Sequence, residues 1–232
     1  MRKGRIRFED RLGLFQANKT YYLLLLIALV SLIGIYPLMT TNGITRLPLT
    51  LFLITTMLTG ALVLSNNRLN QAVSLFSGSL MLIAGTVNDY LHPAESLVAL
   101  SYLAGAIFFL HVSLVLIHDI FSYRKKVAAG LLYGAISVYL LIGISFAFSF
   151  SLIELIHPHS FQGIAGEAGF TSTFASMLYF SFITLTTLGY GDISPLTRQA
   201  IVLSYLEAIC GQMYLTILVP RLVGMYISRD SE

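Results

Sequence analysis

Charged residues are scarce in this sequence. Only 11% of its 232 residues are Asp, Glu, Lys or Arg, whereas a soluble domain carries about 25%. With a mean hydropathy of +0.79, this scarcity excludes a water-soluble enzyme, a disordered chain and a nucleic-acid-binding protein, although the net charge is +3. The single cysteine, Cys210, excludes an intramolecular disulfide framework. The composition indicates an integral membrane protein.

Apolar residues make up 56% of the chain and gather in six runs. A helix needs about 20 apolar residues to cross the hydrocarbon core, so the third run is marginal and the others are adequate. The runs lack the alternating polarity of barrel strands, and helices satisfy their own backbone in lipid. We therefore expect an all-α membrane protein with six transmembrane helices, at residues 21–39, 47–64, 72–87, 97–117, 127–153 and 199–219.

The basic residues orient these spans. If the N-terminus is cytoplasmic, all of the 14 Lys and Arg residues except Arg46 and Arg198 also fall on the cytoplasmic side. The positive-inside rule favours this arrangement, which places both termini in the cytoplasm of a multi-pass protein of the cell membrane. Residues 1–20 form a basic cytoplasmic segment, either a short interfacial helix or a tail that serves only topology.

Residues 154–195 are too polar to span the membrane and too apolar for an ordinary loop. The first part, up to Gly169, is typical of an exposed loop. An apolar helix should then run to Leu185, capped by one of three hydroxyl residues, Thr171, Ser172 or Thr173. At 1.5 Å per residue this helix is only about 22 Å long, so it enters the bilayer and must return. Such re-entrant backbone is tolerated only when it is buried in protein or lines water.

The short helix is followed by Thr186-Thr187-Leu188-Gly189-Tyr190-Gly191-Asp192. This string resembles the selectivity filter of potassium channels, whose TVGYG loops are the standard example of carbonyl-based selectivity. The resemblance covers residues 127–226, which correspond to outer helix, turret, pore helix, filter and inner helix. It implies a single-pore, six-span, prokaryotic-like channel that assembles from four chains. It also implies that K⁺ binds at Thr187, Leu188, Gly189, Tyr190 and Gly191.

The residue types of this string fit the chemistry. A cation that sheds its water needs successive rings of oxygens, so consecutive carbonyls must all turn toward one axis. That geometry alternates left-handed and right-handed dihedrals, and Gly189 and Gly191 adopt positive φ without steric cost. Thr187 can add its hydroxyl oxygen. We expect Leu188 and Tyr190 to point backwards and pack against the pore helix.

The resemblance also suggests residues that support the filter, beginning with Thr186. In similar channels the Asp at the position of Asp192 bonds an aromatic residue of the pore helix, and the matching aromatics here are Tyr179 and Phe180. A solvated charge in the outer vestibule is the alternative for Asp192.

Glu207 is the acid placed well inside a span, where ionisable groups usually face protein or water. We expect it to bond a pore-helix hydroxyl, that of Ser181, Thr184 or another residue; the alternative is that Glu207 lies in the membrane interface.

The last span carries two residues that can bend it. Gly211 matches the hinge glycine of inner helices in this family, and a close helix contact is the alternative explanation for a small residue there. Pro220 falls where inner helices cross, and it removes an intrahelical hydrogen bond. We therefore predict a hinge at Gly211 and a kinked constriction at Pro220.

The remaining domain boundaries follow from the spans. Residues 21–117 form a four-helix peripheral domain, 118–126 a basic cytoplasmic linker, 127–226 the pore domain and 227–232 a short cytoplasmic tail.

Voltage sensors move basic residues spaced along a helix, but residues 97–117 contain no Lys or Arg. We therefore expect weak voltage dependence, or none.

The leading interpretation is a K⁺-selective channel. A poorly selective monovalent cation channel on the same scaffold is one alternative, although Tyr190, which non-selective relatives often change, is intact. A secondary transporter is another, but such proteins usually show paired broken helices in inverted repeats. No nucleophile–base pair is evident in the sequence. We therefore expect no enzymatic activity, no cofactor other than K⁺ ions in the filter, and no nucleic-acid partner; the expected partners are lipid and three further copies of the chain.

Overall fold

The computed structural model of the chain describes residues 19–40, 47–64, 67–90, 94–122, 129–164 and 170–227. The segment before Lys19, the last four residues of the expected linker and the tail after Ile227 therefore lie outside the described residues. The described part is mostly helical, with one two-stranded sheet. Its elements are α2 (Lys19–Thr40), α3 (Leu47–Val63), α4 (Arg68–Tyr90), α5 (Glu95–Ser122), α6 (Ala129–Ile156), β1 (Phe161–Gln162), α7 (Phe170–Leu185), β2 (Ser194–Pro195) and α8 (Arg198–Ile227).

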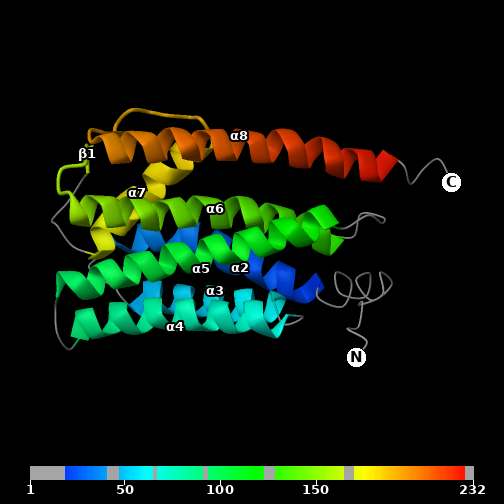
Figure 1. The fold of residues 1–232 in the computed structure, drawn as a ribbon, viewed down its shortest axis with the longest axis horizontal. Coiled ribbons are helices and arrows are strands. Elements are labelled where there is room, and N and C mark those ends of the chain that lie inside the picture. Colours follow the sequence, from blue (N-terminus) through cyan, green and yellow to red (C-terminus); the bar gives the residue numbers. More distant parts are fainter. Residues whose placement is uncertain are drawn as a thin grey trace, which may run out of the picture.

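The long helices α2, α3, α4, α5, α6 and α8 run in alternating directions along the longest axis of the molecule (Figure 1). The start of α2 and the end of α8 consequently lie at the same end. Lys19 and Arg68 open α2 and α4 at that end, whereas Arg198 opens α8 at the opposite end. The orientation of these two ends relative to a membrane remains a prediction.

Four helices of the described part are long and apolar enough to cross a membrane: Arg68–Asn88, Glu95–Ser122, Gly130–Ile156 and Arg198–Arg221. They correspond to the third, fourth, fifth and sixth expected spans. The stretches Lys19–Ile35 and Leu49–Val63 are apolar but shorter, so the first two spans remain predictions. The third helix, expected to be marginal, is 23 residues long, because polar residues at both of its ends continue the helix beyond its apolar centre.

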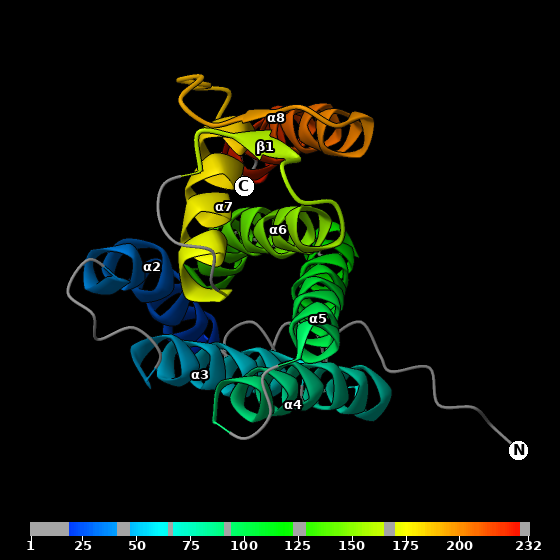
Figure 2. The same ribbon diagram turned by 90° about the vertical axis from the view of Figure 1, so that its left-hand side faces the viewer.

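Helix α6 lies at the centre and packs against α2, α5, α7 and α8 (Figure 2). Aromatic rings fill its contacts with α5 and α7. The ring of Phe148 stacks on Phe109 with centroids 5.5 Å apart and lies 4.5 Å from the ring of Phe174 in α7. Gly105 permits this packing, because a Cβ there would stand 2.7 Å from the Phe148 ring. Helix α5 is therefore joined to α6 and α7 by a continuous series of aromatic rings.

Several boundaries differ from those expected. Helix α5 continues to Ser122, so the first five residues of the expected linker are helical. Helix α6 continues to Ile156 and includes Glu154, because this acid bonds the chain that follows it. Helix α7 already begins at Phe170, so the proposed capping residues Thr171, Ser172 and Thr173 lie within its first turn.

Gly105 offers a test of this packing. A side chain at this position must displace the Phe148 ring, so we expect Gly105→Leu to destabilise the protein by about 1–3 kcal/mol, typical of overpacking. Thermal unfolding in detergent measures the change. Gly34→Leu is the matched control, since nothing lies within 4 Å of a Cβ at Gly34. Equal melting temperatures for the two variants would contradict the packing described.

Candidate functional site

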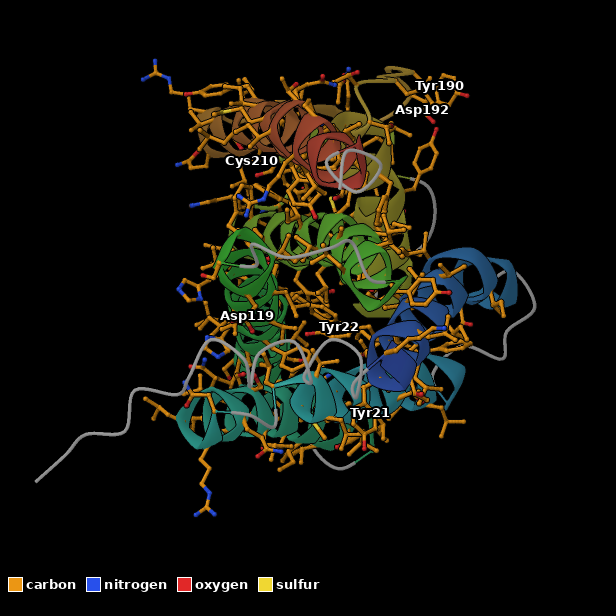
Figure 3. All side chains as sticks on the ribbon, turned by 90° about the vertical axis from the view of Figure 1, so that its right-hand side faces the viewer. Tyr21, Tyr22, Asp119, Tyr190, Asp192 and Cys210 are labelled. Carbon is orange, nitrogen blue, oxygen red and sulfur yellow. The ribbon has the colours of Figure 1, made fainter. Side chains whose placement is uncertain are left out.

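The segment between α7 and α8 lies at the margin of the molecule (Figures 2 and 3). Every residue from Thr186 to Asp192 is exposed in the single chain. Alternate residues adopt the left-handed backbone conformation, with φ of 59° at Thr187, 54° at Gly189 and 80° at Gly191. The two glycines thus have the dihedrals expected from the sequence. At Thr187 the conformation is unusual, because β-branched residues rarely adopt positive φ.

Backbone hydrogen bonds attach this segment to the last turn of α7. The carbonyl of Ile183 accepts the N–H groups of Leu188 and Gly189 at 2.9 and 3.1 Å, and Thr187 N–H donates to Thr184 O at 2.9 Å. The carbonyl of Leu185 accepts the Tyr139 hydroxyl from α6 at 3.1 Å. The free carbonyls at the end of a helix need such partners. The conformation of the segment is therefore set directly by the end of α7.

The side chains of this segment differ in part from expectation. Leu188 and Tyr190 are 54% and 68% exposed, so the expected burial against α7 is wrong for the single chain; the positive φ of their neighbours turns them outward. The hydroxyl of Thr187 accepts a hydrogen bond from Gln212 Nε2 at 3.3 Å. The candidate ligands for a cation are the carbonyl oxygens of residues 187–191 and this hydroxyl. Among the described residues, no three His, Cys, Asp or Glu side chains gather to hold a metal ion.

Asp192 is bonded to the helix behind the segment. Tyr179 Oη donates to Asp192 Oδ2 at 2.7 Å, and Figure 3 shows Asp192 beside Tyr190 at the margin of the molecule. Phe180, the other aromatic candidate, is 4% exposed and packs its ring against Phe150 instead. The hydrogen bond from Tyr179 lowers the pKa of Asp192 below its ordinary value, because it stabilises the carboxylate.

Glu207 is fully buried in α8 behind α7. Its Oε1 contacts the hydroxyl of Ser181, and that hydroxyl lies 2.6 Å from the carbonyl oxygen of Gly143 in α6. A serine hydroxyl has one hydrogen and cannot donate to both oxygens. A neutral Glu207 satisfies both contacts, because its O–H donates to Ser181 while Ser181 donates to Gly143. The other carboxyl oxygen, Oε2, has no hydrogen-bond partner among the described residues, which also disfavours a buried charge.

The two helix-bending candidates lie in an unbroken α8. A Cβ at Gly211 would stand 2.5 Å from the carbonyl oxygen of Leu185, so the close contact considered for this glycine is present, and the hinge remains a prediction. Pro220 lies within the helix, and its kink likewise remains a prediction. The next residue, Arg221, donates to Phe121 O at 2.6 Å and lies 4.7 Å from the Phe121 ring. The C-terminal part of α8 is therefore held by the end of α5.

Sequence reasoning missed three residues of this site. Tyr139 and Gly143 come from α6, and nothing in an apolar span marks one tyrosine or glycine as the partner of a distant carbonyl. Gln212 could have been found, because it is a polar residue beside Gly211 within an expected membrane span. Together these residues connect α6 and α8 to both sides of the end of α7.

Comparisons with known proteins agree with this geometry. Residues 135–228, about two fifths of the chain, match the family described as "Ion channel". The match includes most of α6, all of α7, the exposed segment and α8. It indicates an ion channel embedded in a membrane and a non-enzymatic protein. The comparison with curated proteins gives no match, and neither does the comparison with solved structures.

The Tyr179–Asp192 bond predicts a shift in acid titration. The stability that this bond adds to the folded protein is fully present above the ordinary pKa of an aspartate. It is lost as the pH falls through the lowered pKa of Asp192. Tyr179→Phe removes the donor, so the pKa of Asp192 should rise toward its ordinary value. Carbon-13 NMR of labelled aspartates measures this pKa, with Asp192→Asn to assign the signal. An unchanged pKa in Tyr179→Phe would refute the bond.

Glu207 predicts a contrast between two variants. Glu207→Gln keeps a neutral donor to Ser181 and should retain the thermal stability of the wild type. Glu207→Ala leaves a cavity and removes a buried hydrogen bond, which should cost about 2–4 kcal/mol. Thermal unfolding in detergent distinguishes the two. A Gln variant as unstable as the Ala variant would show that a charged carboxylate is needed.

Proposed function

We propose that this chain forms a K⁺-selective channel in which four copies surround one pore. The observation that carries the proposal is the alternation of positive φ at Thr187, Gly189 and Gly191 within the Thr-Thr-Leu-Gly-Tyr-Gly-Asp string. This alternation is what a column of carbonyls facing one axis requires. The ion channel match includes the same residues.

Assembly from four copies is supported by what the single chain exposes. One chain supplies one strand of oxygens, whereas an ion that sheds its water needs a ring of them. Leu188 and Tyr190 are exposed beside that strand, and neighbouring copies would cover them. Helix α8 also exposes apolar side chains: Ile201, Val202, Tyr205, Leu206, Ile209 and Met213.

The end of α7 supports selectivity for a cation. A helix C-terminus carries about half a negative charge, and α7 ends at Leu185, directly before the proposed filter. A selective pore is favoured over a poorly selective one because both glycines and Tyr190 are present. Support at Thr186, Asp192, Tyr179, Phe180 and Glu207 would then hold the filter open between ions.

The peripheral helices do not carry the charges of a voltage sensor. Helix α5 contains no Lys or Arg, so the proposed channel opens with weak voltage dependence or none. The proposed orientation has both termini in the cytoplasm of a multi-pass protein in the cell membrane. The filter then opens toward the outside, at the end of the molecule where Arg198 lies.

Recordings from purified protein in planar bilayers test the proposal. With K⁺ and Na⁺ on opposite sides, we expect a reversal potential near that of K⁺ and a conductance that varies little with voltage. Gly189→Ala should abolish selective conduction, because its positive φ strains any residue with a Cβ. Gly34→Ala, in open space on α2, should conduct like the wild type.

Two results would overturn the proposal. A reversal potential near zero would favour the poorly selective cation channel. A flux that saturates at roughly a few hundred ions per second, far below conduction through an open pore, would favour a transporter. The mass of the purified protein in detergent, measured by light scattering, separately tests the assembly of four copies.

A further inference from the structure

The turret, residues 157–164 between α6 and α7, is more ordered than the exposed loop expected from its sequence. Its Ser160 and Phe161 are buried. The Phe161 ring packs against Phe150 of α6 and Phe180 of α7, with centroids 5.5 and 5.2 Å apart. The turret is therefore anchored in the space between the outer helix and the pore helix.

Glu154 fixes the beginning of the turret. Its Oε1 accepts the backbone N–H of His159 at 2.9 Å, and its Oε2 accepts that of Phe161 at 3.1 Å. Both oxygens of one carboxylate thus bind the turn that follows α6, where His159 adopts a φ of 66°. The last turn of α6 sets the path of the chain into β1.

Strand β1 pairs with β2, which lies directly after the proposed filter. Phe161 is opposite Pro195, and Gln162 is opposite Ser194. The carbonyl of Ser160 also accepts the N–H of Leu196 at 2.7 Å. The turret and the chain leaving the filter are therefore held together as one unit.

Gly163 brings this unit against the end of the filter itself. Its φ is 81°, and a Cβ built on it would overlap the carbonyl oxygen of Asp192 and stand 3.3 Å from Cα of Ile193. No side chain can fit there without moving the Asp192 backbone. Asp192 is thus held from two sides, by Tyr179 through its carboxylate and by Gly163 through its backbone.

We propose that the turret acts as a clamp on the outer end of the filter, with Gly163 and Glu154 as positioning residues for Asp192. The role of this clamp in conduction rests on the proposed channel function; its role in holding Asp192 does not. Gly163 fixes where the Asp192 carbonyl lies, and Glu154 fixes where β1 lies. Loosening either one frees the filter's outer end to leave its conducting conformation.

Two measurements distinguish the role of the clamp in holding Asp192 from its role in conduction. Hydrogen exchange of the purified protein, followed by mass spectrometry, reports on the backbone of residues 188–197 whether or not the protein conducts. Single-channel recordings report on how long the filter stays open and on its selectivity. The variants are Gly163→Ala, Gly163→Asn and Glu154→Gln, with His157→Ala as the control because His157 is exposed on the same segment.

We expect Gly163→Ala and Gly163→Asn to speed exchange in residues 188–197 and to shorten openings by about tenfold, since overpacking displaces the Asp192 backbone. Asparagine tolerates positive φ, so an Asn variant that behaves like wild type would show that the contact with Asp192 is not the cause. Glu154→Gln keeps one oxygen but points an N–H₂ group at a backbone donor, so it should have a smaller effect in the same direction. His157→Ala should change neither measurement.

A double-mutant cycle tests whether Gly163 and Tyr179 both act on Asp192. Because Gly163 and Tyr179 both act on Asp192, the effects of Gly163→Ala and Tyr179→Phe on opening time should not be additive. Additive effects, or unchanged exchange in a folded Gly163→Ala protein, would overturn the clamp. A wild-type protein that does not conduct K⁺ would instead overturn the proposed function and leave the exchange result valid.

Discussion

The end of α7 imposes the main constraint on this molecule. A helix of 16 residues that stops inside a membrane protein leaves its last carbonyls where lipid offers no hydrogen-bond donor. The chain satisfies them with its own next residues, as Leu188 and Gly189 donate back to Ile183, and with Tyr139 from α6. The unusual backbone of residues 187–189 is thus tied directly to the end of α7. On the proposed function, the same backbone would present its carbonyls to a cation.

Helix α6 supports this arrangement at two levels. Near the end of α7 it provides the Tyr139 hydroxyl for the carbonyl of Leu185 and the Gly143 carbonyl for the hydroxyl of Ser181. Near its own end it provides Phe150 for the aromatic packing and Glu154 for residues 159–161. Helix α6 therefore contacts α7 and the chain before β1 at two separate levels, which fixes the position of α7 along it.

The sequence predicted the helical class, the half-length helix and the glycines with positive φ, because each depends on local composition or on a short string. The resemblance gave Tyr179 and Phe180 as candidate partners of Asp192. Only the packing of the folded chain decides between them, because Phe180 lies against Phe150 and Tyr179 bonds Asp192. Sequence reasoning placed an exposed loop between α6 and α7 but missed the strand pairing and burial there, since β1 is two residues long and has no periodic signal. Gly163 could not be recognised either, because its contact with Asp192 joins segments that are 29 positions apart. Such contacts depend on tertiary packing, which one sequence does not encode locally.

Among the described residues, aromatic rings and one arginine connect α5 to α6, α7 and α8. Phe148 links α5 to Phe174 at the start of α7, and Arg221 binds the carbonyl and ring of Phe121 at the end of α5. Helix α5 therefore reaches α7 through Phe148 of α6, whereas it contacts α8 directly through Arg221. Because α5 contains no Lys or Arg, these links depend on aromatic packing and on the arginine of α8 rather than on basic residues of α5. On the proposed channel function, a movement of α5 would reach the pore through these two contacts.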